Sequence, residues 1–167
     1  MSRYILAHDL GTSGNKATLY DLEGKLCSSS AYEYPTYYPE DGWVEQDSED
    51  WWKAVCITTK DLLEKSGINK NEIACVTFSA QMMGCLPVDK KGCPLRRSII
   101  WADMRAAKQA GFIEKSLGME RVYKITGHRI SSSYSAAKIL WVMDNEPEIF
   151  KRTYKILQAK DYIIYRM

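Results

Sequence analysis

A short segment near the N-terminus combines residue types that can bind phosphate and a divalent cation. Residues 9–16 read DLGTSGNK, so an aspartate is followed by two glycines, two hydroxyl side chains and a lysine. Glycines allow a tight turn whose backbone N–H groups form a concave site for an anion. The carboxylate of Asp9 could hold hydrated Mg²⁺, an ion that prefers oxygen ligands and retains several waters. The alternative interpretation is an ordinary glycine-rich hairpin with an incidental aspartate.

The elements on either side of this segment are predicted to be strands. Residues 3–9 and 16–21 form two of them, and residues 26–34 form a third after a turn at Glu23–Gly24. Three strands joined by tight turns predict an antiparallel meander. The segment therefore differs from a Walker loop and from a dinucleotide-binding loop, which have other glycine spacings and lead into a helix.

Helices and strands alternate along the rest of the chain. Asp47 or Ser48 is predicted to cap a helix that ends at Gly67, and a continuous apolar run at 73–78 predicts a buried strand. The apolar face of that helix is expected to contain Trp52, Val55, Cys56, Leu62 and Leu63. The other expected elements are strands at 84–86, 95–100 and 155–157, helices at 105–117, 119–126 and 135–145 (capped by Ser135), and a short last helix capped by Asp161.

The composition is that of an ordinary globular protein. The 167 residues are 46% hydrophobic and 26% charged with a net charge of +2, which excludes a disordered chain and argues against nucleic-acid binding. Five cysteines form no C-x-x-C pair and the two histidines lie near none of them in sequence, so neither a zinc site nor a disulfide framework is expected. No apolar segment is long enough for a signal peptide or a membrane span. We therefore expect a cytoplasmic protein with reduced thiols and no membrane partner.

Several motifs, in order along the chain, resemble those of the FGGY carbohydrate kinases, and most of all xylulokinases. The first is the DLGTSG segment with Lys16 and Ala17, which resembles the phosphate loop of these enzymes. The others are GWVEQD at 42–47 followed by WW at 51–52, SAQMMG at 79–84, IWADMR at 100–105, AKILW at 137–141, EPE at 146–148 and KDY at 160–162. The resemblance covers essentially the whole chain.

The resemblance implies an α/β fold of the ribonuclease-H-like, actin-like ATPase class, with a mixed sheet, the N-terminal meander and flanking helices. Two such domains would close over ATP and a sugar, and residues 1–167 would be the first of them, truncated before its end. The implied activity is ATP-dependent phosphorylation of a sugar hydroxyl, with ATP and Mg²⁺ as cofactors. The family's catalytic base lies beyond residue 167, so this fragment without the C-terminal domain of the same chain is expected to be inactive.

The resemblance also assigns roles to individual residues. Asp9 would act in catalysis as the aspartate linked to Mg²⁺ near the transferred phosphate, and not as the base. Nucleotide phosphates would be contacted by Gly11, Thr12, Ser13, Gly14 and Lys16. Substrate-binding residues would be Gln81, Met82, Met83, Trp101, Asp103 and Arg105. Ordinary structural roles are the alternatives: core packing for the methionines and Trp101, a salt bridge at a helix start for Arg105, and a solvated strand position for Lys16.

Two departures from the family pattern bear on the substrate. Met83 stands where xylulokinases typically have histidine, and Ala102 replaces the usual asparagine. A thioether cannot make the hydrogen bond to a sugar hydroxyl that an imidazole makes, and such groups carry much of the discrimination between polar substrates. These departures argue against xylulose itself, so the expected substrate class extends from a ketopentose such as xylulose to a related ketose or polyol.

Two further functions are alternatives to the sugar kinase. One is a non-catalytic half-domain that serves as a binding or regulatory module. The other is a different actin-like ATPase, such as a chaperone, against which the sugar-pocket character of residues 81–84 and 101–103 argues. Apolar surface that a missing half would cover is expected to favour self-association, so a homodimer is considered.

Overall fold

The computed structural model describes residues 3–167, which divide into two compact units. The first, called here the sheet unit, contains the described residues up to Thr36 together with Asp47–Gln81 and Ala159–Met167. The second, called here the helical unit, contains Tyr37–Gln46 and Met82–Gln158. Each unit is described by itself.

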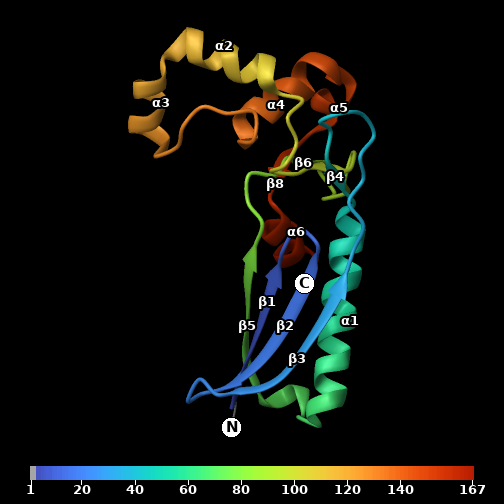
Figure 1. Ribbon diagram of the computed structural model, residues 1–167. Coiled ribbons are helices and arrows are strands. Elements are labelled where there is room, and N and C mark those ends of the chain that lie inside the picture. Colours follow the sequence, from blue (N-terminus) through green and yellow to red (C-terminus); the bar gives the residue numbers. More distant parts are fainter. Residues whose placement is uncertain (1–2) are drawn as a thin grey trace. The chain divides into compact units, whose positions relative to one another are not determined.

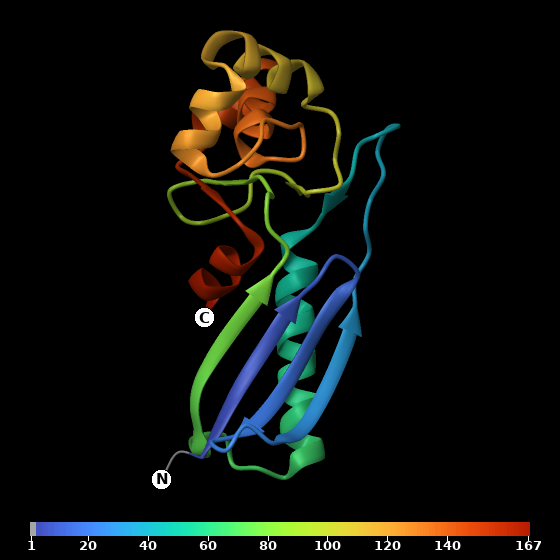
Figure 2. The ribbon, with the colours of Figure 1, turned by 60° about the vertical axis from the view of Figure 1, so that its left-hand side comes forward.

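The sheet unit is built on four strands in the order β3-β2-β1-β5. Strands β1 (Tyr4–Leu10), β2 (Gly14–Asp21) and β3 (Leu26–Glu33) pair antiparallel, which confirms the predicted meander. Strand β5 (Ile73–Ala80) pairs with β1 in parallel, so the sheet is mixed. Helix α1 (Ser48–Ser66) covers one face of this sheet (Figure 1; Figure 2).

Helix α1 begins and ends where its sequence signals predict. The Asp47 side chain accepts a hydrogen bond from the backbone N–H of Glu49 at 3.0 Å, which satisfies one of the unpaired donors of the first turn. Gly67 ends the helix in the left-handed conformation, with φ of 66°, and its N–H donates to the Leu63 carbonyl. The predicted buried face is partly wrong: Trp51 is buried, whereas Trp52 is half-buried and Cys56 is exposed. The helix is therefore turned relative to the expected face.

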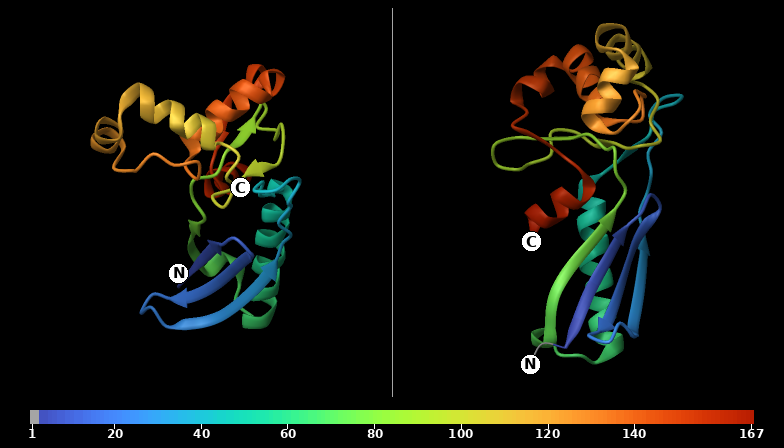
Figure 3. Two further views of the ribbon diagram at one scale, coloured as in Figure 1. Left: turned by 45° about the horizontal axis from the view of Figure 1, so that its top comes forward. Right: turned by 90° about the vertical axis from the view of Figure 1, so that its left-hand side faces the viewer.

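Alternate residues of β1 and β2 form the core against α1. Buried Leu6, Ala17 and Leu19 pack with Leu62 of the helix. Because successive side chains of a strand point to opposite faces, odd-numbered β1 residues and even-numbered β2 residues lie on the face away from the helix. Both views of Figure 3 show α1 on the same face of these strands.

Strand β5 is less buried than its apolar sequence predicts. Residues 74–77 are exposed, although a buried strand was expected at 73–78. The reason is position, because β5 lies at the edge of the sheet and α1 packs against β2 and β3. The sheet unit is completed by the 3₁₀ turn Lys70–Glu72 and by α6 (Ala159–Arg166), which contacts α1 and β5. Asp161 lies inside the first turn of α6, so it is not the predicted cap.

The helical unit contains two small antiparallel strand pairs and four helices. Its strands are β4 (Glu45–Gln46) paired with β7 (Ser98–Ile99), and β6 (Leu86–Val88) paired with β8 (Lys155–Leu157). Its helices are α2 (Ala107–Leu117), α3 (Met119–Thr126), α4 (Ser135–Asn145) and α5 (Pro147–Arg152).

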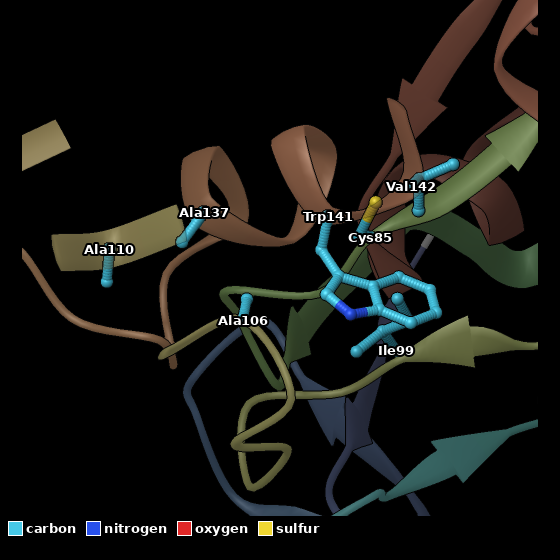
Figure 4. Packing of buried hydrophobic residues seen from close by; sticks show 7 residues of the cluster. All are labelled: Cys85, Ile99, Ala106, Ala110, Ala137, Trp141 and Val142. Atoms are coloured by element: carbon cyan, nitrogen blue, oxygen red, sulfur yellow. The ribbon is translucent and has the colours of Figure 1, made fainter. Parts of the chain in front are cut away.

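The core of the helical unit gathers around one indole ring. Trp141 extends from α4 into a cluster that also contains Cys85, Ile99, Ala106, Ala110, Ala137 and Val142 (Figure 4). Trp43 meets Trp141 edge to face, with ring centroids 5.2 Å apart. This core holds the chain segments around residues 43, 85 and 99 against helices α2 and α4.

The predicted cap of α4 is replaced by a different contact. The helix starts at Ser135, but no side-chain hydrogen bond caps it. The Ser135 hydroxyl instead donates to the carbonyl of Gly84 at 2.8 Å.

Among residues 3–167, no helix combines the length and apolar character needed to cross a bilayer.

Candidate functional site

The segment predicted to bind phosphate forms a closed turn between β1 and β2. The N–H of Gly11 donates to the carbonyl of Gly14 at 2.9 Å, and the N–H of Tyr34 donates to the carbonyl of Ser13 at 3.2 Å. The Tyr34 hydroxyl donates to the Gly11 carbonyl. The turn is therefore held from within and from the end of β3. Sequence reasoning missed Tyr34, because its contact with the turn depends on the pairing of β2 with β3.

Gly14 is required by the close approach of β3. A Cβ at this position would lie 2.6 Å from the carbonyl oxygen of Tyr32 and 3.1 Å from the Cα of Glu33. Both neighbours are backbone atoms, so neither can move without displacing the strand. At Gly11 a Cβ would meet only the Gly14 carbonyl oxygen at 3.4 Å. The two glycines of the turn therefore differ: Gly14 is needed for packing in the folded chain, whereas Gly11 tolerates a Cβ far better.

A buried polar cluster anchors the turn to α1. The Asn15 amide donates to the Thr58 hydroxyl at 2.7 Å and contacts Nδ1 of His8 at 3.0 Å, while Thr59 lies 3.3 Å from the other ring nitrogen. His8 is 2% exposed, and this burial lowers its pKa from 6.5 to about 4, although the hydrogen bond to Asn15 acts in the opposite direction. The imidazole is therefore neutral near pH 7. The ring supports the turn through its contact with Asn15. Its side chain points to the opposite face of β1 from the exposed Asp9.

Asp9 and Lys16 face each other on the sheet surface opposite α1. They are directly paired positions of β1 and β2, and both are exposed. They line a pocket of about 260 Å³ whose other lining residues are Gly11, Ser13, Gly14, Asn15, Ala31, Tyr32 and Glu33. Thr12 is half-buried in the turn and does not line this pocket. Asp9 and Glu33 thus place negative charge, and Lys16 positive charge, around this pocket beside the turn.

The pKa of the Tyr34 hydroxyl is affected by the negative charge of Asp9. Burial raises the pKa of the Tyr34 hydroxyl well above its usual value, and the nearby Asp9 carboxylate raises it further. The hydroxyl therefore stays protonated and keeps donating to the turn. Within the described residues, no three His, Cys, Asp or Glu side chains gather as a metal cluster. Asp9 fits Mg²⁺ in another way, since this ion is often held by one or two carboxylates and substrate phosphates.

Gln81, which is predicted to bind substrate, contacts the turn between β1 and β2. Its backbone N–H donates to the Leu10 carbonyl at 2.8 Å, and its side-chain amide lies 3.5 Å from the Gly11 carbonyl. Gln81 belongs to the sheet unit, whereas Met82, Met83 and the other predicted substrate residues belong to the helical unit.

Met82 and Met83 differ in exposure and in backbone conformation. Met82 is 65% exposed, while Met83 is half-buried. Met83 has φ of 64° and is the one non-glycine residue with positive φ among those that the structure describes. A long side chain in the left-handed region is strained, and such strain collects at functional sites. Trp101 is 42% exposed, so part of its indole reaches the surface.

Asp103 and Arg105 are buried and bind each other. The Asp103 carboxylate accepts from the Val44 N–H at 2.6 Å and from Arg105 Nη2 at 2.8 Å. The guanidinium lies 3.8 Å from the Trp43 ring centre and 2.9 Å from the Glu45 carboxylate. Both side chains are fully buried, and therefore they brace the 100–105 segment from inside.

Arg96 extends the same ionic cluster. Its guanidinium pairs with Glu45, and it pairs with Glu146 at 2.6 Å. Sequence reasoning missed Arg96 and Glu45 as a pair, because they are far apart in the chain. The charges of this cluster are paired within the helical unit, as buried charges must be if they are not to destabilise it.

Comparison with known proteins identifies the family. Residues 4–167 match the N-terminal domain of the FGGY family of carbohydrate kinases. A xylulose kinase of Bacillus subtilis is 33% identical over 165 residues, which are 99% of this chain and 33% of that protein. The structure of a xyloylose kinase from Brucella ovis has a TM-score of 0.90 and 33% identity over 95% of this chain and 33% of that one. A Plasmodium falciparum glycerol kinase with ADP has a TM-score of 0.83 and 25% identity over 98% of this chain and 34% of that one.

The similarity in sequence is matched by a similarity in fold. The chain spans about a third of the length of each of these relatives. The high TM-score against the Brucella ovis structure confirms the predicted fold class, an α/β domain of the actin-like ATPase type with a mixed sheet. Together with the family match over nearly all described residues, this shows that the chain belongs to the FGGY family of carbohydrate kinases.

Proposed function

We propose that the protein containing this chain transfers a phosphoryl group from ATP to a hydroxyl of a ketopentose such as xylulose, or of a related ketose or polyol. The observation that carries the proposal is the closed turn between β1 and β2. It requires a glycine at position 14 and lies between an exposed carboxylate and an exposed ammonium on one face of the sheet. Membership of a carbohydrate kinase family supplies the reaction class.

The sheet unit is assigned to the nucleotide phosphates. Lys16 supplies a positive charge, and the hydroxyls of Thr12 and Ser13 supply donors beside the backbone of the turn. Asp9 would hold Mg²⁺, which when bound neutralises the negative charge of the transferring phosphoryl group. Tyr34 and the cluster of His8 and Asn15 keep the turn in place before the nucleotide arrives. We propose that the proton acceptor for the sugar hydroxyl lies beyond residue 167, as it does in the family.

The helical unit is assigned to the acceptor sugar. Exposed Met82 and Trp101 offer apolar surface for the C–H face of a sugar, as does the partly exposed Met83. Buried Asp103 and Arg105 hold the Trp101 segment in place without reaching solvent themselves. Direct polar contacts from this unit are fewer than a histidine at 83 and an asparagine at 102 would give.

The acceptor is therefore best identified by a panel of sugars. The protein made from the complete gene is supplied with ATP, Mg²⁺ and one of a set of ketopentoses, polyols including glycerol, and hexoses, and ADP release is followed. We expect the lowest KM for one ketose or polyol. Release that does not depend on any sugar would contradict the proposal and favour a non-catalytic binding or regulatory module. The 167-residue chain alone is expected to show no turnover.

The same preparations test two associated proposals. Exposed apolar side chains on α2 and α3, among them Phe112 at 63% and Ile125 at 74%, support self-association of the isolated chain. A strict monomer by light scattering at high concentration would contradict it.

All five cysteines are free in the described structure, which supports a reducing, cytoplasmic location. Localisation of a tagged protein checks that proposal.

A further inference from the structure

We propose that Lys138 is a positioning residue, which together with Ser135 and Gln158 holds Met83 in its left-handed conformation and so shapes the surface that binds the acceptor sugar. The inference rests on the proposed function for its sugar-binding consequence. The clamp itself rests on contacts within the helical unit alone.

The clamp acts on the peptide group that joins Met83 to Gly84. Lys138 Nζ donates to the Met83 carbonyl at 2.8 Å, and the Gly84 N–H donates to the Gln158 side-chain oxygen at 2.9 Å. Both ends of one peptide plane are therefore fixed. The orientation of this plane sets ψ of Met83, so the two contacts restrict one of the two backbone dihedrals of that residue and limit which values of φ it can adopt.

A third contact closes the network. The Ser135 hydroxyl donates to the Gly84 carbonyl at 2.8 Å, and the Gln158 amide donates to the Ser135 oxygen at 3.0 Å. Lys138 also donates to the Ser133 carbonyl, which ties it to the start of α4. These groups over-determine the backbone around Met83, which is the condition under which a strained left-handed residue persists.

Lys138 is an unfavourable choice for packing alone. Its side chain is 0% exposed, although a buried amine loses its hydration. Burial is the largest influence on its pKa and lowers it to about 8; interactions with Asp103 and Cys85 raise the pKa, and the Arg105 charge lowers it. The neutral amine retains two N–H donors, enough for both carbonyls. An apolar residue would fill the same space at a lower desolvation cost, so the hydrogen bonds account for the lysine.

The consequence falls on the side chain of Met83 and on exposed Met82 beside it. Releasing the carbonyl lets Met83 leave the left-handed region, which redirects both methionines. Lys138 does not itself reach the surface, so it acts through them. We expect its loss to weaken sugar binding and to leave ATP binding to the sheet unit unchanged.

The test is a double-mutant cycle in the protein made from the complete gene. Lys138→Met keeps the volume and removes the donors, and it should raise the KM for the sugar about tenfold with the KM for ATP unchanged. Met83→Gly accepts positive φ without strain. When Lys138→Met is added to the Met83→Gly variant, the sugar KM should differ from that of Met83→Gly alone by less than about twofold. Lys108→Met, at an exposed position of α2, is the matched control and should have no effect.

A merely structural lysine gives a different result. It would lower thermal stability and change both KM values equally, whether residue 83 is Met or Gly, and that outcome overturns the proposal. If Lys138→Met does not fold, Gln158→Leu removes the second contact on the same peptide and should show the same dependence on residue 83.

A crystal structure of Lys138→Met, or of Gln158→Leu, separates the clamp from the proposed function. Met83 at negative φ supports the clamp even if the wild-type protein phosphorylates no sugar, in which case the proposed function and the sugar-binding part of this inference fail. Met83 still at positive φ with unchanged contacts overturns the clamp, whatever the activity.

Discussion

Single residues in both units are determined by what lies within a few ångströms of them. At position 14 the backbone of β3 leaves no room for a Cβ. At positions 103 and 105 a carboxylate and a guanidinium are buried and satisfied mainly by each other, by Val44 and by Glu45. Neither requirement is visible in the residue types alone, and each leads to a prediction about one substitution.

Gly14→Ala is expected to destabilise the chain by about 2 kcal/mol, because the new Cβ must displace the Tyr32 carbonyl. It should also weaken nucleotide binding, since the turn moves with β3. Gly111→Ala is the matched control: it lies within α2 with nothing within 4 Å of the added Cβ, and it should stabilise by roughly 0.5–1 kcal/mol. Urea unfolding measures both. Equal effects of the two alanines would contradict the steric argument.

Asp103→Asn is expected to lower the free energy of unfolding by about 3 kcal/mol, because it leaves the buried Arg105 guanidinium with the Glu45 carboxylate as its remaining counter-charge. Chemical denaturation measures the change. The control is Glu148→Gln, which removes an exposed pair with Lys151 and should have no measurable effect. A neutral result for Asp103→Asn would mean that the buried cluster contributes nothing to the fold.

At the scale of elements, the turn depends on a buried polar layer between the sheet and α1. His8 and Asn15 come from β1 and β2, and Thr58 and Thr59 come from the helix. The layer links the position of the turn to the packing of α1. Its one titratable group, His8, makes the link sensitive to acid.

Stability of the sheet unit is expected to fall as the pH is lowered from about 6.5 to about 4. In this window the unfolded His8 binds a proton, whereas the folded residue, with its pKa of about 4, does not. The difference amounts to about 3 kcal/mol at full extent. Unfolding free energies measured across this range should lose that slope in His8→Gln. They should keep it in His128→Gln, a change at an exposed residue; a slope unaffected by His8→Gln would contradict the prediction.

Local sequence patterns predict most of the helices and strands. The errors concern burial, which depends on contacts between segments far apart in the chain. The meander, the Asp47 cap and the Gly67 end follow from short patterns, and the structure confirms them. The exposure of β5 and the burial of Trp51 depend on which strands α1 covers, which no local pattern specifies. The Lys138 clamp joins five positions spread from 83 to 158, so it becomes visible only in the fold.

At the scale of the whole molecule, this chain is one part of a longer architecture in its relatives. It spans about a third of the xylulose kinase and glycerol kinase chains that it resembles. Within that third, our proposal assigns phosphate binding to the sheet unit and sugar binding to the helical unit. The division explains why substrate preference and nucleotide binding are expected to respond to different substitutions.

The most direct test of the kinase proposal is sugar-dependent ADP release by the protein made from the complete gene, compared with Asp9→Asn. Asp9 is exposed beside the turn, so the substitution should leave the fold intact while turnover falls about a hundredfold or more. Glu64→Gln, an exposed change on α1, should keep full activity. Sugar-dependent release that disappears in Asp9→Asn is the predicted result. A folded wild-type protein that releases no ADP with any sugar, or an Asp9→Asn variant as active as wild type, would contradict it.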